Sequence, residues 1–300
     1  MTFPLLPPLL LHPVADLRWN AFSVHPSTVI GLAAIGGWYL WAARRAPTAD
    51  PAAAGPPSAR RTPTPLQRVS FFAGLLVIFL SLNGPVHDLS DYYLFSAHMV
   101  QHLLLTLIMP PLLLLGTPGW MLEPLLRPRP IAALARVVTR PILAYALFNV
   151  TVAAWHVPSL YNTAVVIHEV HIVQHLMFMA TAVIMWWPLL SPIPTLPRLP
   201  YPGQMLYCFL MAVPMTIVAV YIAMADNLLY PAYASAPRLW GISPMLDQHI
   251  GGLIMWIPGG LFFYGVMTVV FFKWSAHQRD DQAGAQVDWR PGTAPEIVTR

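Results

Sequence analysis

The sequence predicts an all-α protein, a polytopic bundle of helices that crosses a membrane several times. Two observations lead to this fold class. Of the 300 residues, 57% are hydrophobic and only 9% are charged, whereas soluble domains carry about 25% charged residues. The hydrophobic residues also lie in long runs bounded by proline, glycine or arginine. Backbone groups in lipid must be hydrogen-bonded within the chain, so each run is expected to be a helix.

Seven of these runs are candidate transmembrane helices. In chain order they cover Thr28–Ala43, Arg68–Asn83, Tyr93–Leu115, Pro141–His156, His168–Leu190, Gly203–Ala225 and Gln248–Lys273. The first, second and fourth are short, so their ends are expected to extend or the bilayer to thin around them. The domain organisation follows from these runs: an outer N-terminal segment (1–27), a membrane domain (28–274) containing a cytoplasmic Pro/Ala-rich linker (44–67), and a disordered cytoplasmic tail (275–300).

The arginines predict the orientation of the bundle. Basic residues follow the first, third, fifth and seventh runs, at Arg44, Arg45, Arg60, Arg61, Arg68, Arg127, Arg129, Arg136, Arg140, Arg198, Lys273 and Arg279. The opposite loops hold only Arg18 and Arg238. The positive-inside rule therefore places the N-terminus outside and the C-terminus in the cytoplasm. The net charge of +4 is part of this topological signal, so it does not indicate a nucleic-acid partner.

Histidines gather at the outer ends of several runs. They are His98 and His102 in the third run, His156 in the fourth, His168, His171 and His175 in the fifth, and His249 in the seventh. His87 lies in the outer loop between the second and third runs. The i, i+4 and i, i+3, i+7 spacings place each set on one helix face. Neutral imidazole is the commonest metal ligand in proteins. The sequence therefore predicts a metal site near the outer face of the membrane.

Other residues are expected to support this site. Asp88, Asp91, Glu169 and Asp247 lie at the same level and are candidates to accept the second ring N–H of a ligating histidine. Met99 is a candidate additional ligand, and the loop 227–247 is a candidate lid or docking segment. Imidazole and thioether ligands without a thiolate favour copper as Cu(I), because the single cysteine, Cys208, lies in an apolar run. Zinc bound by imidazoles stays open.

Four motifs resemble the bacterial caa3-type cytochrome c oxidase assembly factors. They are Ser96-Ala-His-Met-Val-Gln-His102 with Pro110-Pro111, Trp155-His156-Val-Pro158, His171-Ile-Val-Gln-His175 with Trp186-Trp187-Pro188, and Leu239-Trp240-Gly241 with Gly251-Gly252. The resemblance covers about residues 65–272. It implies a seven-helix protein of the bacterial cytoplasmic (inner) membrane that is not an enzyme and is needed to make active haem–copper oxidase.

The resemblance also implies what the site does. The expected role is delivery of copper, with oxidase subunits and periplasmic copper chaperones as partners. His98, His102, His156, His171 and His175 match the family motifs, whereas His168 fits the pattern less clearly. At His249 the family is expected to have glutamine.

Three other functions stay open at this point. A haem-b electron carrier would use two histidines on facing helices, although an i, i+4 step of about 6 Å cannot stack two haems on one helix pair. A membrane metalloenzyme with histidine boxes would carry those boxes on the cytoplasmic side, which disagrees with the arginine pattern. A metal permease should show ligand residues continuing through the bilayer, and the inner halves of the runs hold almost none.

Overall fold

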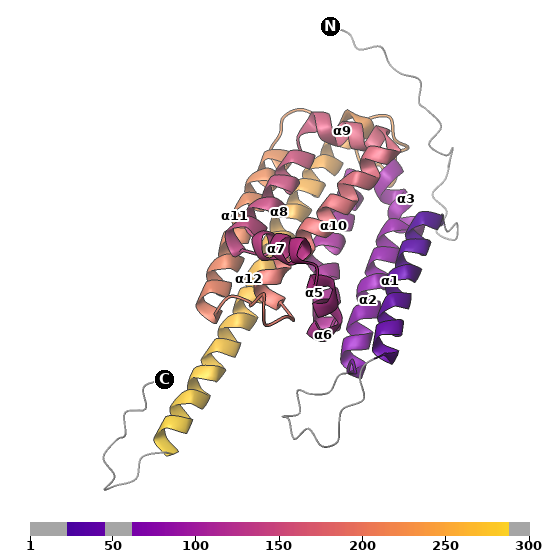
Figure 1. Ribbon diagram of the computed structural model, residues 1–300. Helices are drawn as coiled ribbons and strands as arrows, with labels where there is room; N and C mark the ends of the chain where they lie inside the picture. The colour runs from indigo at the N-terminus through magenta and orange to yellow at the C-terminus, as the bar shows by residue number, and fades with distance from the viewer. Residues whose placement is uncertain (1–22, 46–61, 288–300) are drawn as a thin grey trace.

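The computed structural model describes residues 23–45 and 62–287, which form helices and short connections without a strand. Figure 1 shows an elongated bundle with α3 and α9 at one end and α6 toward the other. The elements are α1 (Pro26–Arg44), α2 (Pro65–Leu82), α3 (Gly84–Tyr92), α4 (Phe95–Leu103), the π-helical η2 (Leu104–Ile108), α5 (Met109–Gly116), α6 (Gly119–Leu122), the 3-10 helix η3 (Glu123–Leu126), α7 (Arg129–Val138), α8 (Pro141–Trp155), α9 (Pro158–Val166), α10 (His168–Leu190), α11 (Tyr201–Ala223), the 3-10 helix η4 (Pro231–Tyr233) and α12 (Pro244–Val287).

Within the described residues, five helical segments are long and apolar enough to cross a membrane, so the protein is a multi-pass helical membrane protein. They are α2, the continuous segment Phe95–Gly116, α10, α11 and the Pro244–Gln282 part of α12. A sixth span exists only if α7 and α8, which meet at a 77° bend, are counted as one.

The expected count of seven spans is therefore not confirmed within residues 23–45 and 62–287. The expected fourth span corresponds to α8, whose 15 residues extend only about 22 Å, less than a hydrocarbon core of about 30 Å. The expected first span corresponds to α1, which has 19 residues but includes Gly31, Gly36 and Gly37, so its apolar character is diluted. Both segments are helices, as expected, but neither meets the requirements for a span by itself.

The C-terminal expectation is corrected in part. We expected residues 275–300 to be disordered, but α12 continues without a break to Val287. Residues 288–300 lie outside the described residues, as do 1–22 of the expected outer segment and 46–61 of the expected linker.

A π-helical turn joins the histidine-bearing helix α4 to α5. Pro110 and Pro111 have no backbone N–H, so the carbonyl of Thr106 cannot receive the usual helical hydrogen bond. The indole N–H of Trp186, on α10, donates to that carbonyl instead at 2.9 Å. Freed carbonyls inside a membrane bundle must find such a partner, so this contact holds α10 against the segment that carries His98 and His102.

Helix α12 fixes the start of α4. Asp247, in the first turn of α12, accepts hydrogen bonds from the backbone N–H groups of Phe95 and Ser96, and from the Ser96 hydroxyl. These N–H groups would otherwise be unpaired at the helix N-terminus. A side chain at Gly251 would collide with Phe95, and one at Gly252 would lie 2.6 Å from the backbone nitrogen of Ala223. The two glycines thus allow α12 to approach α4 and α11 closely.

The core has two parts. The larger part is buried between α4, α8, α10, α11 and α12, and includes Phe148, Phe178, Trp186 and Phe263. The smaller part lies between α1, α2 and the η2–α5 segment, and includes Tyr39, which stacks on Phe71 with ring centroids 4.0 Å apart. The histidine-bearing faces of α4 and α10 lie beside the larger core.

Candidate metal site

Five histidines from α4, α10 and the end of α8 converge at the end of the bundle that carries α3 and α9. His98, His102, His156, His171 and His175 are all buried, each at most 7% exposed. The Nε2 atoms of His98 and His102 lie 2.8 Å apart. The ring of His175 has its centroid 5.7 Å from that of His98 and 5.5 Å from that of His102. The i, i+4 spacing within α4 and α10 produces this convergence, because both helices present their histidine face to the other.

One group of three imidazoles has the geometry of an ion site. Single ring nitrogens of His98, His102 and His175 all lie within 4.8 Å of one another. Within the described residues, Nε2 of His175 is buried and has no hydrogen-bond partner. Buried polar atoms in folded proteins are nearly always paired, so this orphaned atom indicates a missing ligand. A bound cation would pair it.

His156 is poised beside this group. Its Nδ1 lies 2.7 Å from the carbonyl of Val152, one turn earlier in α8. A carbonyl can only accept, so the proton of the neutral ring must be on Nδ1 and the lone pair on Nε2. That Nε2 is buried without a partner among the residues that the structure describes, and the ring centroid is 5.8 Å from that of His102. His156 is therefore available as a further ligand.

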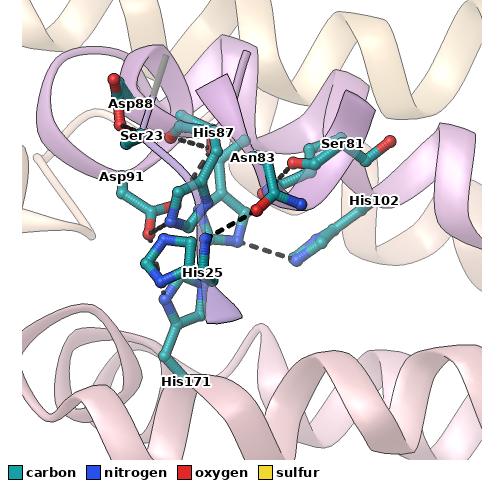
Figure 2. A network of polar contacts seen from close by, with 12 residues as sticks. Ser23, His25, Ser81, Asn83, His87, Asp88, Asp91, His102 and His171 are labelled. Atoms are coloured by element: carbon teal, nitrogen blue, oxygen red, sulfur yellow. Dashed lines mark hydrogen bonds and ion pairs between the residues drawn. The ribbon is translucent and has the colours of Figure 1, made fainter. Parts of the chain in front are cut away.

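Asp91, on α3, brings a carboxylate to the site. Its Oδ2 atom lies 3.3 Å from Nδ1 of His171 and 3.4 Å from Nε2 of His87. Figure 2 shows His171 reaching from α10 toward Asp91 and His87, with His25 beside them. Burial by itself would raise the pKa of the Asp91 carboxyl, but the His171 and His87 imidazoles hold that pKa well below its ordinary value. The pKa of His25 is lowered, by burial first and then by His87 and His168.

A cluster of tyrosines closes the site from the loop 227–247. The hydroxyl of Tyr233 donates to the carbonyl of Ser90 at 2.9 Å and lies 3.2 Å from both Nδ1 of His98 and the hydroxyl of Tyr161. Tyr230 donates to the carbonyl of His156 at 2.9 Å. The loop is thus a lid that is hydrogen-bonded to two of the histidine-bearing segments. These contacts agree with the first of the two roles expected for the loop, a lid, and do not test the second, docking of a partner.

The remaining predicted residues lie at the edge of the cluster or away from it. His168 and Glu169 are exposed at the start of α10, where His168 lines a small cavity with Asp91, His98 and His171, and its ring stacks on that of His25 with centroids 6.0 Å apart. Asp88 accepts a hydrogen bond from Ser23, and His249 lies 3.1 Å from the carbonyl of Ala225.

Two of the expected supporting residues have structural contacts instead. Asp247 caps α4 rather than accepting from a histidine. Met99 is fully buried and lies beside Gly251 of α12. Because it directly follows His98, its side chain leaves α4 in a different direction from the histidines. Of the four expected acidic partners, only Asp91 contacts histidines, and His87 joins the site through that carboxylate.

Sequence reasoning missed Tyr233, Tyr161 and two buried glutamines. Gln101 donates to the carbonyl of Ser81 at 2.6 Å, and its Oε1 has no partner among the described residues. Neither side-chain atom of the fully buried Gln174 has one. A signal for the glutamines was present, because His98-Met-Val-Gln-His102 and His171-Ile-Val-Gln-His175 repeat one pattern. Tyr161 lies on α9, just after His156 in sequence, so its position was a signal as well. Tyr233 had no such signal, since the lid is distant from the histidines in sequence.

Comparison with known proteins supplies the family. Curated relatives include the uncharacterized proteins Mb0105 of Mycobacterium bovis and MT0111 of Mycobacterium tuberculosis, each 28% identical over 205 residues. These matches cover 62% of this chain and 31% of each relative. The uncharacterized protein ML1998 of Mycobacterium leprae is 25% identical over 223 residues, which cover 69% of this chain and 34% of the relative. The chain thus spans about a third of the length of these relatives.

No solved structure matches the chain significantly. The family described as cytochrome c oxidase caa3 assembly factor (Caa3_CtaG) matches residues 37–277, which is most of the chain. This range contains all four motifs that carried the resemblance. The prediction made from those motifs is confirmed, and the chain belongs to the family of cytochrome c oxidase caa3 assembly factors.

Proposed function

We propose that this protein carries copper as cargo during assembly of cytochrome c oxidase and hands the ion to an oxidase subunit. The observation that carries the proposal is the convergence of His98, His102 and His175, whose ligand nitrogens lie within 4.8 Å of one another in a buried place. Family membership supplies the process, oxidase assembly. The site supplies the chemistry, since neutral imidazoles bind transition metals.

The charge balance of the inner group favours Cu(I). Three imidazoles add no charge, so a monovalent ion leaves one buried positive charge and a divalent ion leaves two. Burying an uncompensated charge in a low dielectric is expensive, so the monovalent ion is the better cargo. The single cysteine does not contribute, because Cys208 is buried on α11 and belongs to neither candidate ligand group.

Spare ligands make transfer possible. In the described part of the chain, Nε2 of His156, beside His102, and Nε2 of His171, beside His175, have no hydrogen-bond partner, and the ring centroids of His171 and His175 are 4.3 Å apart. An ion needs only three or four ligands, so it can gain one imidazole before it loses another. This stepwise exchange is the property expected of a carrier rather than of a permanent structural site. We assign the protein no catalytic turnover.

The location of the site suits delivery at the outer face of the bacterial inner membrane. Arg44 and Arg45 lie at the end of α1 and Arg68 in the first turn of α2, at the end of the bundle away from α3. The positive-inside rule makes that end cytoplasmic and the histidine end periplasmic. The proposed partners are an oxidase subunit that receives copper there and a periplasmic chaperone that supplies it.

A haem-b carrier is the less favoured function. Axial ligands of a haem must face each other across the macrocycle. On the facing helices α4 and α10, the ring centroids of His98 and His171 are 5.3 Å apart and those of His102 and His175 are 5.5 Å apart, so the rings are too close for a macrocycle between them. For one ion, by contrast, the Nε2 atoms of His98 and His102, which lie 2.8 Å apart, need to separate by only about 0.5 Å to give bonds of about 2.0 Å.

Copper binding tests the proposal. The full chain, purified in detergent without oxygen, is titrated with Cu(I) against a coloured Cu(I) chelator, and an optical spectrum is recorded beside it. We expect one tightly bound Cu(I), no Soret band, and at least a hundredfold loss of affinity in His98→Ala/His102→Ala. In cells, the same variant should insert into the membrane normally but should not restore oxidase activity.

The matched control is His249→Gln/His277→Ala, which also removes two histidines. His249 is bonded to a loop carbonyl and His277 is exposed, so their loss should leave Cu(I) affinity unchanged. Equal copper binding by the wild type and the His98→Ala/His102→Ala variant would refute the proposed site. A Soret band in the purified protein would favour the haem carrier instead.

A further inference from the structure

We infer that the protein has a second metal position, made by Asp91, His98 and His171, which takes a divalent ion and shares His98 with the copper position. We call Asp91–His98–His171 the outer position and His98–His102–His175 the inner position. Ligand atoms of the outer three residues all lie within 4.8 Å of one another. The inference rests on the proposed function only in assigning the inner position to Cu(I).

The separation of two ligand atoms fits a single ion. Oδ2 of Asp91 and Nδ1 of His171 lie 3.3 Å apart. Two ligands at about 2.0–2.1 Å from a tetrahedral ion are roughly 3.3 Å from each other, so an ion could replace the shared proton without displacing either side chain far. The third ligand, His98, has its ring centroid 5.3 Å from that of His171.

Space exists for the ion at this point. Asp91, Tyr92, His98, Val165, His168 and His171 line a cavity with about 20 Å³ of free space. That is room for about one water molecule or one ion. His171, which supplies Nδ1 to this position, is buried, with 7% of its surface exposed. His168, which lines the same cavity, is exposed, so the cavity lies next to the protein surface.

The donor set of the outer position differs from that of the inner one. A carboxylate is a hard anionic donor, and two imidazoles with one carboxylate suit a divalent transition ion such as Zn(II) or Cu(II). The charge of Asp91 also offsets one of the two positive charges of the ion. The inner position has only neutral imidazoles, and it lies deeper along α4 and α10, because His102 and His175 are each one turn farther from the helix starts.

His98 links the two positions. Its Nε2 lies 2.8 Å from Nε2 of His102, and its Nδ1 lies 3.2 Å from the hydroxyl of Tyr233. Because Nδ1 of His98 is bonded to the Tyr233 hydroxyl, both positions need its Nε2, so an ion held at one competes for a ligand of the other. Occupancy of the outer position should therefore weaken binding at the inner position, and the reverse must hold to the same extent.

The experiment uses the full chain in detergent and two probes, Zn(II) and Cu(I). Zn(II) is titrated into His102→Ala, which lacks the inner position, with and without Asp91→Asn. We expect one Zn(II) in His102→Ala and a 10–100-fold weaker affinity when Asp91→Asn is added. Cu(I) is titrated into the wild type and Asp91→Asn, and the affinities should agree within about twofold, because Asp91 is not a ligand of the inner position. His98→Ala should weaken both ions.

Controls separate the possible outcomes. Asp88→Asn removes a neighbouring carboxylate that accepts a hydrogen bond from Ser23. It should change neither the Zn(II) affinity nor the Cu(I) affinity. His171→Gln provides a second outer variant if Asp91→Asn is not monodisperse. If Asp91→Asn weakens Cu(I) as much as Zn(II), Asp91 only orients His171 and the second position is refuted. A Zn(II) affinity that is unchanged by both Asp91→Asn and His171→Gln would refute it as well. Absence of Cu(I) binding in the wild type would refute the proposed function and leave the Zn(II) comparison intact.

Discussion

Removal of the Asp247 carboxylate should destabilise the protein by freeing the start of α4. Asp247 is 2% exposed. It accepts from the backbone N–H of Phe95 at 2.6 Å, from that of Ser96 at 3.1 Å, and from the Ser96 hydroxyl. His98 follows within the same turn of the helix, so fraying there moves a proposed ligand. The variant is Asp247→Ala, with Asp247→Asn as the conservative partner.

The magnitude follows from the lost hydrogen bonds. Loss of a helix cap costs about 1 kcal/mol, and each buried N–H left unpaired costs about 1–3 kcal/mol. Some of this is recovered because water can reach a helix start, so we expect a loss of about 2–4 kcal/mol for Asp247→Ala. That corresponds to a fall in Tm of roughly 5–12 °C. Asp247→Asn retains one acceptor oxygen and should lose about half as much.

Thermal unfolding of the metal-free protein in detergent measures the effect. The control is Asp226→Ala, which removes an exposed aspartate from the connection between α11 and α12. The control should unfold at the wild-type temperature. The reasoning is refuted if Asp247→Ala keeps the wild-type Tm while its Cu(I) affinity falls. That result would mean that the carboxylate acts on a metal ligand, as the sequence suggested, and not as a helix cap.

Two further predictions concern the lid and the orientation. Tyr233→Phe removes the hydroxyl that contacts Nδ1 of His98 and the Ser90 carbonyl. It should lower Cu(I) affinity about tenfold in the chelator titration. The control Tyr201→Phe should leave that affinity unchanged. Equal affinities for the two variants would show that the lid does not orient His98. For orientation, a Cys208→Ala chain carrying Ser235→Cys in the exposed lid should react with an impermeant maleimide added outside intact spheroplasts. The same chain with Gln278→Cys should react only after lysis, and the opposite pattern would place the histidine site in the cytoplasm.

The sequence by itself determined the membrane class, the helices and the histidine ladders, because these depend on local properties. Long apolar runs must form helices in lipid, and i, i+4 spacing puts His98 and His102, or His171 and His175, on one face whatever surrounds them. The motifs around these residues were sufficient to predict the family, which the comparison confirmed.

Span length depends on where a helix begins and bends. The fourth expected span corresponds to α8, which begins at Pro141 after a 77° bend from α7, so its 15 residues have no straight helical continuation. α1 fails for a different reason. It has 19 residues and forms a helix as expected, but it is not apolar enough to count as a span.

Only the tertiary structure decided which polar residues meet the histidines. Asp88, Asp91, Glu169 and Asp247 look alike in sequence, yet Asp91 contacts His171 and Asp247 caps α4. Tyr233 reaches His98 across 135 positions of the chain. Such contacts depend on how α3, α10, α12 and the lid pack together, and packing is a long-range property that no local spacing encodes.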